Sequence, residues 1–261
     1  MTEDELLALA VRAARAGGDA LLAHCGRELA VAAKSSPTDP VSDADLASEA
    51  AIRALLRDER PADGYLGEEG SARTTESGLE WVVDPLDGTV NFLYGIPQWS
   101  VSVAVRDGDG TLAGAVLDPC RGELFTATRA GPAQLRAGGV ERTLSGPPGR
   151  DLRHALVASG LAYDARVRAA QGPVLSRLGA EVRDLRRFGS AALDLCWTAA
   201  GRYDAYFERT VKPWDIAAGE LICRRAGLEV HGLTEHPDLP WGIVVAPRAL
   251  VGGLLALVDG P

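Results

Sequence analysis

The stretch Trp81-Val-Val-Asp84-Pro-Leu-Asp87-Gly-Thr89-Val-Asn-Phe92 changes from the pattern of a strand to that of a helix. Pro85 restricts the residue before it to extended geometry, so we expect Asp84 to end a strand that contains residues 81–83. Asp87 and the glycine after it are typical of a turn. Thr89 can begin a helix whose first N–H groups have no partner inside the helix. The stretch therefore predicts a strand–turn–helix junction with two carboxylates beside an anion-binding helix start.

The two carboxylates of this junction allow two interpretations. Alone, Asp84 and Asp87 would repel a phosphate, whereas divalent cations between the acids and the ligand would make the same arrangement attract one. The alternative is an ordinary junction in which Asp87 only caps the helix. Both interpretations remain open for the junction taken by itself.

Acidic residues also stand at the ends of three other predicted elements. Glu68 and Glu69 follow a short strand, Asp215 begins a helix, and Asp45 lies in the first turn of another helix. Each position is ordinary when taken alone, because helix starts favour acids. Together, four separate segments offer hard oxygen ligands with no nearby cysteine or histidine, which indicates magnesium or manganese rather than zinc.

Turn residues and hydrophobic periodicity divide the remaining chain into helices and strands. A capping box at Thr2 opens a helix to about Cys25, and a second at Ser42 opens a helix through Leu56. The other predicted helices are Ala165–Leu178 (interrupted at Gly172-Pro173), Ser190–Ala200, Asp215–Arg225 and a last one that ends at Val258. The predicted strands are Gly64–Gly67, Glu80–Asp84, the meander Trp99–Arg106, Thr111–Leu117 and Glu123–Thr128, then Ala155–Ser159, Tyr203–Phe207 and Ile243–Ala246.

Length, charge and cysteine usage limit the classes of protein to consider. A chain of 261 residues forms one large α/β domain or two small ones, and its net charge of −9 argues against a nucleic-acid binder. No apolar run approaches the ~18 residues of a membrane span, and the acidic start is not a signal peptide. The four scattered cysteines fit reduced thiols. We therefore expect a cytoplasmic protein that binds neither nucleic acid nor membrane.

With these segments in place, the sequence resembles the inositol monophosphatase family of magnesium-dependent, lithium-sensitive phosphatases. The matching motifs are Gly67-Glu68-Glu69, Asp84-Pro-Leu-Asp-Gly-Thr89-Val-Asn-Phe92, Lys212-Pro-Trp-Asp-Ile-Ala-Ala-Gly219 and Lys34-Ser-Ser-Pro-Thr-Asp39 with Asp45. The resemblance implies one domain over residues 1–261 with an α/β/α/β/α sandwich of the inositol monophosphatase and fructose-1,6-bisphosphatase type, and a homodimer. We place a metal-binding half at about residues 1–145 and an α/β half at about 151–261, divided by the Pro- and Gly-rich segment Gly146–Arg150.

The resemblance also implies a set of metal ligands. Glu68, Asp84 and the Leu86 carbonyl correspond to ligands of a first Mg²⁺, and Asp84, Asp87 and Asp215 to ligands of a second. Glu68 would also help to hold a weaker third ion through water molecules. Mn²⁺ is a possible substitute, because the implied donors are all oxygens.

The catalytic and substrate-binding residues follow from the same resemblance. Thr89, paired with Asp45, is implied to orient and deprotonate the attacking water, with Glu68 as the third catalytic residue. In-line attack by this metal-activated water would release phosphate without a phosphoenzyme. The implied substrate contacts are Asp87, Gly88, Thr89, Gly189, Ser190, Ala191, Glu208 and Asp215.

Several functions remain as alternatives. The default is hydrolysis of a small polyol monophosphate, myo-inositol 1-phosphate above all. Related phosphatases act on histidinol phosphate, fructose 1,6-bisphosphate or 3′-phosphoadenosine 5′-phosphate, and a non-catalytic scaffold for a protein partner is the least favoured reading. A haloacid-dehalogenase mechanism is excluded, because its D-x-D-G-T pattern would need Asp where this chain has Pro85.

Overall fold

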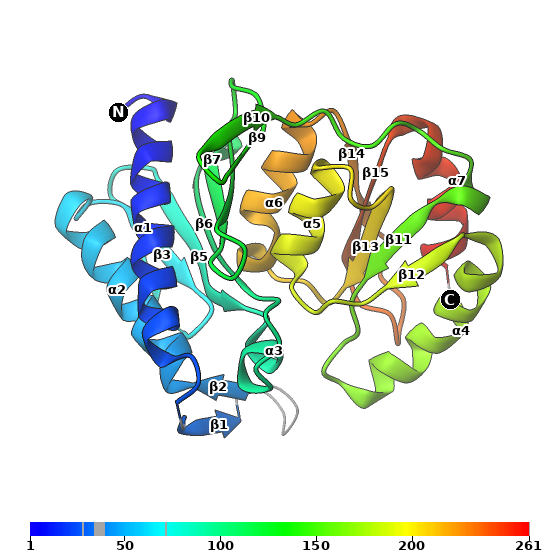
Figure 1. Ribbon diagram of the computed structural model, residues 1–261, viewed down its shortest axis with the longest axis horizontal. Coiled ribbons are helices and arrows are strands. Elements are labelled where there is room, and N and C mark those ends of the chain that lie inside the picture. Colours follow the sequence, from blue (N-terminus) through cyan, green and yellow to red (C-terminus); the bar gives the residue numbers. More distant parts are fainter. Residues whose placement is uncertain (28, 34–39, 71, 261) are drawn as a thin grey trace.

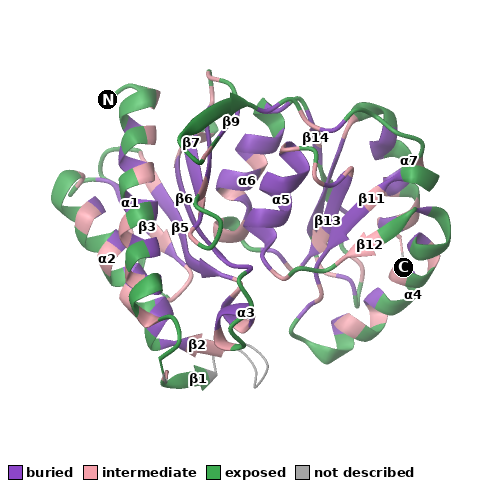
Figure 2. Ribbon diagram, viewed as in Figure 1, coloured by how far each residue is buried: buried purple, intermediate pink, exposed green. Residues whose placement is uncertain are grey.

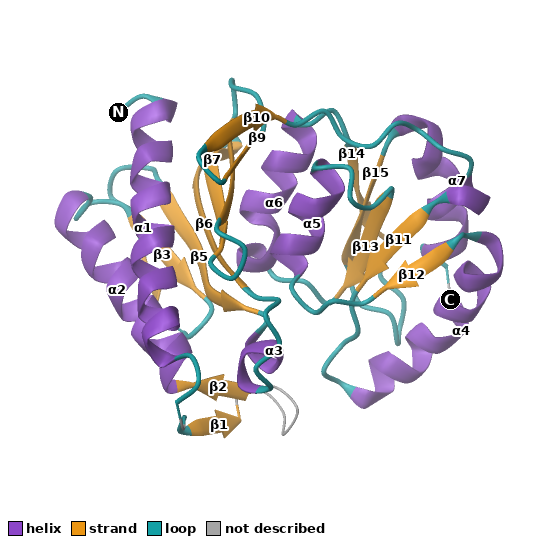
Figure 3. Cartoon of the chain, viewed as in Figure 1, coloured by secondary structure: helices purple, strands orange, loops and turns teal. Residues whose placement is uncertain are grey.

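Helices and sheets alternate in five layers along the molecule (Figures 1 and 3). The computed structural model describes residues 1–27, 29–33, 40–70 and 72–260. The helices are α1 (Glu3–His24), α2 (Asp43–Glu59), α3 (Thr89–Leu93), the 3-10 helix η1 (Leu152–His154), α4 (Ala165–Glu181), α5 (Ala191–Ala199), α6 (Pro213–Arg225) and α7 (Arg248–Val258). In order, the layers are α1 with α2, a large sheet, α5 with α6, a smaller sheet, and α4 with α7. This order confirms the predicted α/β/α/β/α sandwich.

The larger sheet has eight strands in the order β10-β9-β8-β7-β6-β5-β3-β4. Its strands are β3 (Gly64–Gly67), β4 (Ala72–Arg73), β5 (Glu80–Asp87), β6 (Ser100–Asp107), β7 (Gly110–Asp118), β8 (Glu123–Thr128), β9 (Gln134–Ala137) and β10 (Val140–Thr143). The meander β6–β8 is confirmed. Only β3 and β5 run parallel among the recorded pairs of this sheet. A separate pair, β1 (Val31–Ala33) and β2 (Pro40–Ser42), precedes α2.

The smaller sheet has five strands in the order β12-β11-β13-β15-β14. Its strands are β11 (Leu156–Ser159), β12 (Asp184–Arg186), β13 (Ala205–Arg209), β14 (Glu229–Leu233) and β15 (Gly242–Ala246). The strands β4, β12 and β14 were not expected from the sequence, because they are short and carry charged or polar residues. Residues 146–150 connect the last strand of the first sheet to η1 and the second sheet.

Strand alternation explains how the large sheet packs against helices on both faces. On β5, Val82 belongs to the cluster shared with α5 and α6, whereas Trp81 and Val83 belong to the cluster shared with α1 and α2. Because successive side chains of a strand point to opposite faces, a continuous apolar run can fill two cores. A third cluster lies between the smaller sheet and α4 with α7. Figure 2 shows β5, β6 and α5 as predominantly buried.

Helix starts follow the predicted capping chemistry. The Thr2 hydroxyl accepts from the Glu5 N–H, and the Glu5 carboxylate accepts from the Thr2 N–H, which is the predicted capping box of α1. Ser42 and Asp45 form the same reciprocal arrangement at α2. None of the helices in the described ranges is both long and apolar enough to cross a membrane.

Three expected element boundaries are wrong. The strand expected to end at Asp84 continues to Asp87 through an irregularity, which lets Pro85 sit where no ladder N–H is needed. Helix α4 is not interrupted at Pro173, since Val167, Val174 and Leu178 bury its apolar face along the whole length. The strand expected at 203–207 is Ala205–Arg209, so Glu208 lies inside the strand rather than after it.

We predict that the close approach of β7 to α6 makes any side chain at Gly114 destabilising. A Cβ on Gly114 would lie 2.8 Å from Ala218 Cα, a backbone atom that cannot move alone. Gly114→Ala should therefore lower the free energy of unfolding by ~1–3 kcal/mol in urea titrations. The control is Gly252→Ala in α7, where a Cβ meets nothing within 4 Å. It should be neutral or stabilising by about 0.5–1 kcal/mol, and an unchanged stability of Gly114→Ala would contradict the packing argument.

Candidate active site

A cavity of about 490 Å³ lies where the end of β5 meets α3, beside the start of α6 and the strand β13. Six acidic side chains line it: Glu68, Asp84, Asp87, Asp164, Glu208 and Asp215. They come from five separate segments of the chain and from both sheets. The fold therefore gathers acids that are up to about half the chain apart.

The parallel pairing of β3 with β5 brings the first two acids together. The Glu68 N–H donates to the Val83 carbonyl at 3.2 Å, so Glu68 lies directly beside Asp84. Asp84 is 1% exposed, and its Oδ1 accepts from the Leu86 N–H at 3.0 Å. Burial raises the pKa of Asp84 well above its usual range, and the charges of Glu68, Asp87 and Asp215 raise it further.

Asp87 is held by the start of α5. Its Oδ2 accepts from the Ser190 hydroxyl at 2.6 Å and from the Ala192 N–H at 2.7 Å, and its Oδ1 accepts from the Ala191 N–H at 3.2 Å. Burial raises the pKa of Asp87 to about 6, although these donors stabilise the ionised form and limit the shift. The carboxylate thus has a fixed orientation set by a helix more than a hundred residues away.

Asp215 has its position set by the first turn of α6. Its Oδ2 accepts from the Lys212 N–H at 2.7 Å, which fixes the side chain in the first turn of the helix. Desolvation raises the pKa of Asp215 well above its usual range, and the charges of Glu68 and Asp87 add to the effect. The state in which Asp84, Asp87 and Asp215 are all ionised without a counter-charge is therefore unfavourable.

Thr89 and Asp45 form a buried pair next to the acids. The Thr89 hydroxyl lies 2.9 Å from Asp45 Oδ1 and 3.1 Å from the Leu86 carbonyl oxygen, and it can donate to one of them at a time. The Ser42 N–H and hydroxyl both donate to Asp45 Oδ2. Asp45 is 0% exposed and lies behind Thr89 rather than on the cavity wall. The pair is therefore rigid and oriented.

Glu208 faces the cavity from the interior of β13. It accepts from the Tyr206 hydroxyl at 2.9 Å, a contact that arises because residues two apart on a strand share a face. A Cβ at Gly160 would lie 1.8 Å from Glu208 Oε1, so the glycine leaves room for the carboxylate. Desolvation raises the pKa of Glu208 to about 7.

Most of the expected site residues meet at this cavity. Leu86, Gly88, Thr89, Gly189 and Ala191 also line it. Ser190 does not, because its hydroxyl is directed to Asp87. The motif residues Lys34–Asp39 lie outside the described residues.

Sequence reasoning missed part of the cavity wall. The residues concerned are Leu161, Ala162, Tyr163, Asp164, Arg187, Thr210, Val211, Lys212 and Trp214. Lys212 and Trp214 belong to the motif that contains Asp215, which was a usable signal. The segment after β11 carries no motif, so only the folded chain could place it here.

The donor set of this cavity suits a hard divalent cation. Its acids and the Leu86 carbonyl offer oxygen donors, and no cysteine or histidine lines the wall. Ionised acids this close together and this poorly solvated need a counter-charge, as the raised pKa values of Asp84, Asp87 and Asp215 indicate. Across the described residues, no three Asp, Glu, His or Cys side chains are already grouped as a ligand set. The fit therefore rests on donor chemistry and shared desolvation.

Comparison with known proteins agrees with this arrangement. Residues 2–259 match the inositol monophosphatase family. The chain belongs to the inositol monophosphatase family. Among curated members, inositol-1-monophosphatase of Mycobacterium bovis is 41% identical over 237 residues, which cover 89% of this chain and 78% of that protein. Nus factor SuhB of Salmonella typhimurium is 40% identical over 260 residues, which cover 97% and 96%.

Solved structures of the inositol monophosphatase family share the same fold. The extragenic suppressor protein suhB of Bartonella henselae superposes with a TM-score of 0.89 at 33% identity and covers 98% of each chain. The Thermotoga maritima IMPase superposes with a TM-score of 0.85 at 26% identity, covering 98% of this chain and 97% of that one. The resemblance inferred from the motifs is thus confirmed for the whole chain.

The raised pKa values predict how stability changes with pH in chelator. Asp87 and Glu208 bind protons more tightly in the folded chain, with pKa values of about 6 and about 7, than in the unfolded chain. Their stabilising contribution is complete at low pH and is lost as pH rises through these values. In urea titrations of the metal-free protein, the free energy of unfolding should fall between about pH 4 and about pH 7.

The Glu208→Gln variant tests the assignment of this pH dependence. It should show a smaller fall over the same range, because one of the responsible carboxylates is gone. Glu76→Gln, at an exposed position, should keep the wild-type slope. Equal slopes for all three proteins would show that Glu208 does not titrate as inferred.

Proposed function

We propose that this family member is a magnesium-dependent phosphatase that hydrolyses a small polyol monophosphate, most favourably myo-inositol 1-phosphate. The observation that carries the proposal is one cavity lined by Glu68, Asp84, Asp87 and Asp215 with the Thr89–Asp45 pair beside it. Relatives of 41% identity named inositol-1-monophosphatase support the same choice of substrate.

The proposed metal ligands are those that the resemblance implied. Glu68, Asp84 and the Leu86 carbonyl would hold one Mg²⁺, Asp84, Asp87 and Asp215 a second, and Glu68 would help to hold a third. Bound Mg²⁺ supplies Lewis-acid polarisation of the phosphoryl group and neutralises charge on the leaving oxygen. The α5 donors to Asp87 and the Lys212 N–H to Asp215 keep each carboxylate oriented for that purpose.

Thr89 and Asp45 are proposed to move the proton of the attacking water. When the Thr89 hydroxyl donates to Asp45, its lone pairs remain available to accept a hydrogen bond from water. The proton then passes from the water to Thr89 Oγ1 as the Thr89 proton passes to Asp45. The two Ser42 donors hold Asp45 in place during this transfer.

Substrate contacts complete the proposal. The backbone N–H groups of Gly88 and Thr89 would donate to phosphate oxygens, and Glu208 would accept from the polyol hydroxyls. Gly189 and Ala191 would form the adjoining wall, while Ser190 would act through Asp87. The acids of the cavity favour a single phosphate, since a second would meet the Glu208 carboxylate, near which Arg187 is the recorded cationic side chain. We therefore rank histidinol phosphate, fructose 1,6-bisphosphate and 3′-phosphoadenosine 5′-phosphate below inositol phosphate.

A protein-binding role is the second candidate function. The observation that favours it is the 40% identity over 97% of the chain to a protein named Nus factor SuhB. We further propose that the chain forms a single domain, because the central core cluster draws on both sheets. The proposed assembly is a cytoplasmic homodimer, as the family resemblance implies. We also propose that lithium inhibits the phosphatase activity and that the protein binds neither nucleic acid nor membranes.

Activity should require Mg²⁺ and disappear in excess chelator, as phosphate-release assays can measure. Asp87→Asn and Asp215→Asn should each reduce turnover by orders of magnitude while the fold persists, because each removes a charged ligand and keeps the side-chain shape. Thr89→Ala should lower turnover more than it weakens Mg²⁺ binding. Asp109→Asn, at an exposed turn, is the matched control and should behave as wild type. Full turnover in chelator would refute the metal requirement.

Glu208→Gln should raise the KM for myo-inositol 1-phosphate more than it lowers kcat. The substitution weakens a contact that is present in both the ground state and the transition state. Hydrolysis of an aryl phosphate, which has no polyol hydroxyls, should hardly change. Equal losses of activity on both substrates, or no loss on either, would show that Glu208 does not bind the polyol hydroxyls.

A further inference from the structure

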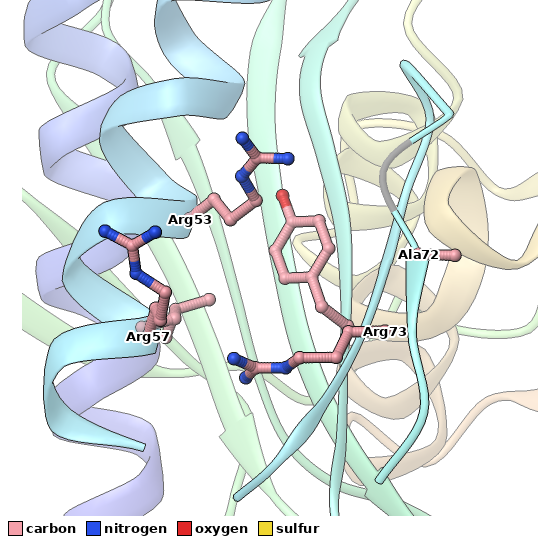
Figure 4. A pocket seen from close by; sticks show the side chains of 6 residues that line it. Arg53, Arg57, Ala72 and Arg73 are labelled. Carbon is pink, nitrogen blue, oxygen red and sulfur yellow. The ribbon is translucent and has the colours of Figure 1, made fainter. Parts of the chain in front are cut away.

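A second cavity, of about 370 Å³, lies between α2 and the outer strands β3 and β4 of the large sheet. It is lined by Arg53, Leu56 and Arg57 from α2, Tyr65 from β3, and Ala72 and Arg73 from β4. None of these residues lines the cavity of the candidate active site. Figure 4 shows the Arg53 and Arg57 side chains extending from the helix and that of Arg73 extending back toward it from the strand.

Arg57 and Arg73 supply positive charge to this cavity. Among ion pairs between described residues, none includes Arg57 or Arg73. The Arg73 Nε donates to the Asp63 carbonyl at 2.9 Å, and its Nη2 lies 3.3 Å from the Arg60 carbonyl. These uncharged acceptors fix the guanidinium without neutralising it. Burial raises the pKa of the Tyr65 phenol, and the charge of the buried Glu49 carboxylate, one turn before Arg53 on α2, raises it further.

The remaining wall of the cavity is apolar. Leu56 is 1% exposed and Tyr65 is 4% exposed, and both line the cavity from elements on opposite sides of it, α2 and β3. Arg53 and Arg57 are four residues apart on α2, so they share a face of the helix. A cavity of this size suits a small molecule, with guanidinium groups for an oxyanion and an apolar surface for an organic body.

We propose that this cavity, the arginine pocket, is a binding site for a small organic phosphate. Arg57 and Arg73 approach the phosphoryl oxygens from the helix and the strand. The Arg57 guanidinium can donate paired hydrogen bonds to an oxyanion, and Arg73 donates through Nη1, because its Nε and Nη2 are taken by the carbonyls. Leu56 and Tyr65 contact the organic part of the ligand. The inference is independent of the proposed phosphatase activity, because the two cavities share no residue.

Calorimetric titration of the metal-free protein with phenylphosphonate, which cannot be hydrolysed as an ester, tests the arginine pocket. Excess chelator removes divalent cations from the candidate active site, where the acidic side chains outnumber Arg187 and Lys212 and repel the dianion. Wild-type protein should bind the probe at one site, and Arg57→Gln and Arg73→Gln should each weaken binding by ~10-fold or more. Inorganic phosphate should bind more weakly than phenylphosphonate, because it leaves the apolar wall uncovered.

The matched control is Arg15→Gln, which removes an exposed arginine of α1 that lines neither cavity. It should bind phenylphosphonate as the wild type does, and thermal unfolding of each variant checks that the fold persists. No binding by wild type, or equal binding by wild type and a folded Arg57→Gln, would overturn the proposal. Equal affinities for phosphate and phenylphosphonate would overturn the claim that the apolar wall contacts the organic part of the ligand.

Discussion

Electrostatic repulsion among acids that share one poorly solvated cavity is the constraint on which the site depends. Asp84 and Asp87 are buried, Asp215 faces them, and each of their pKa values is raised by lost solvent and by neighbouring acids. Such a cluster is held together only when rigid elements fix each carboxylate and a proton or a cation supplies the missing positive charge. The surrounding structure meets the first of these requirements with backbone donors.

The rigid elements act through their ends. Asp87 lies after the irregularity of β5 and faces the N–H groups of Ala191 and Ala192, while Asp215 closes the first turn of α6. The helices α5 and α6 pack on each other between the two sheets, so the positions of both carboxylates depend on the same pair of helices. A substitution that moves these helices should therefore disturb the site without touching an acidic residue.

The two cavities are opposite in charge. One gathers carboxylates on a net acidic chain and attracts phosphate only through cations, whereas the arginine pocket presents guanidinium groups directly. Direct guanidinium recognition needs no metal and does not polarise the phosphoryl group for attack. This difference separates a site suited to turnover from one suited to binding.

The sequence by itself determined the capping boxes of α1 and α2, the β6–β8 meander and the acids of the site, because these depend on local spacing. Only the tertiary structure decided that Ser190 binds Asp87 across 103 positions, that Glu208 lies within a strand, and that Arg57 and Arg73 face one cavity. Contacts between distant segments depend on strand order and helix packing, which local patterns do not encode. Strand ends shifted for the same reason, since a bulge or an extra residue is settled by the neighbouring strand.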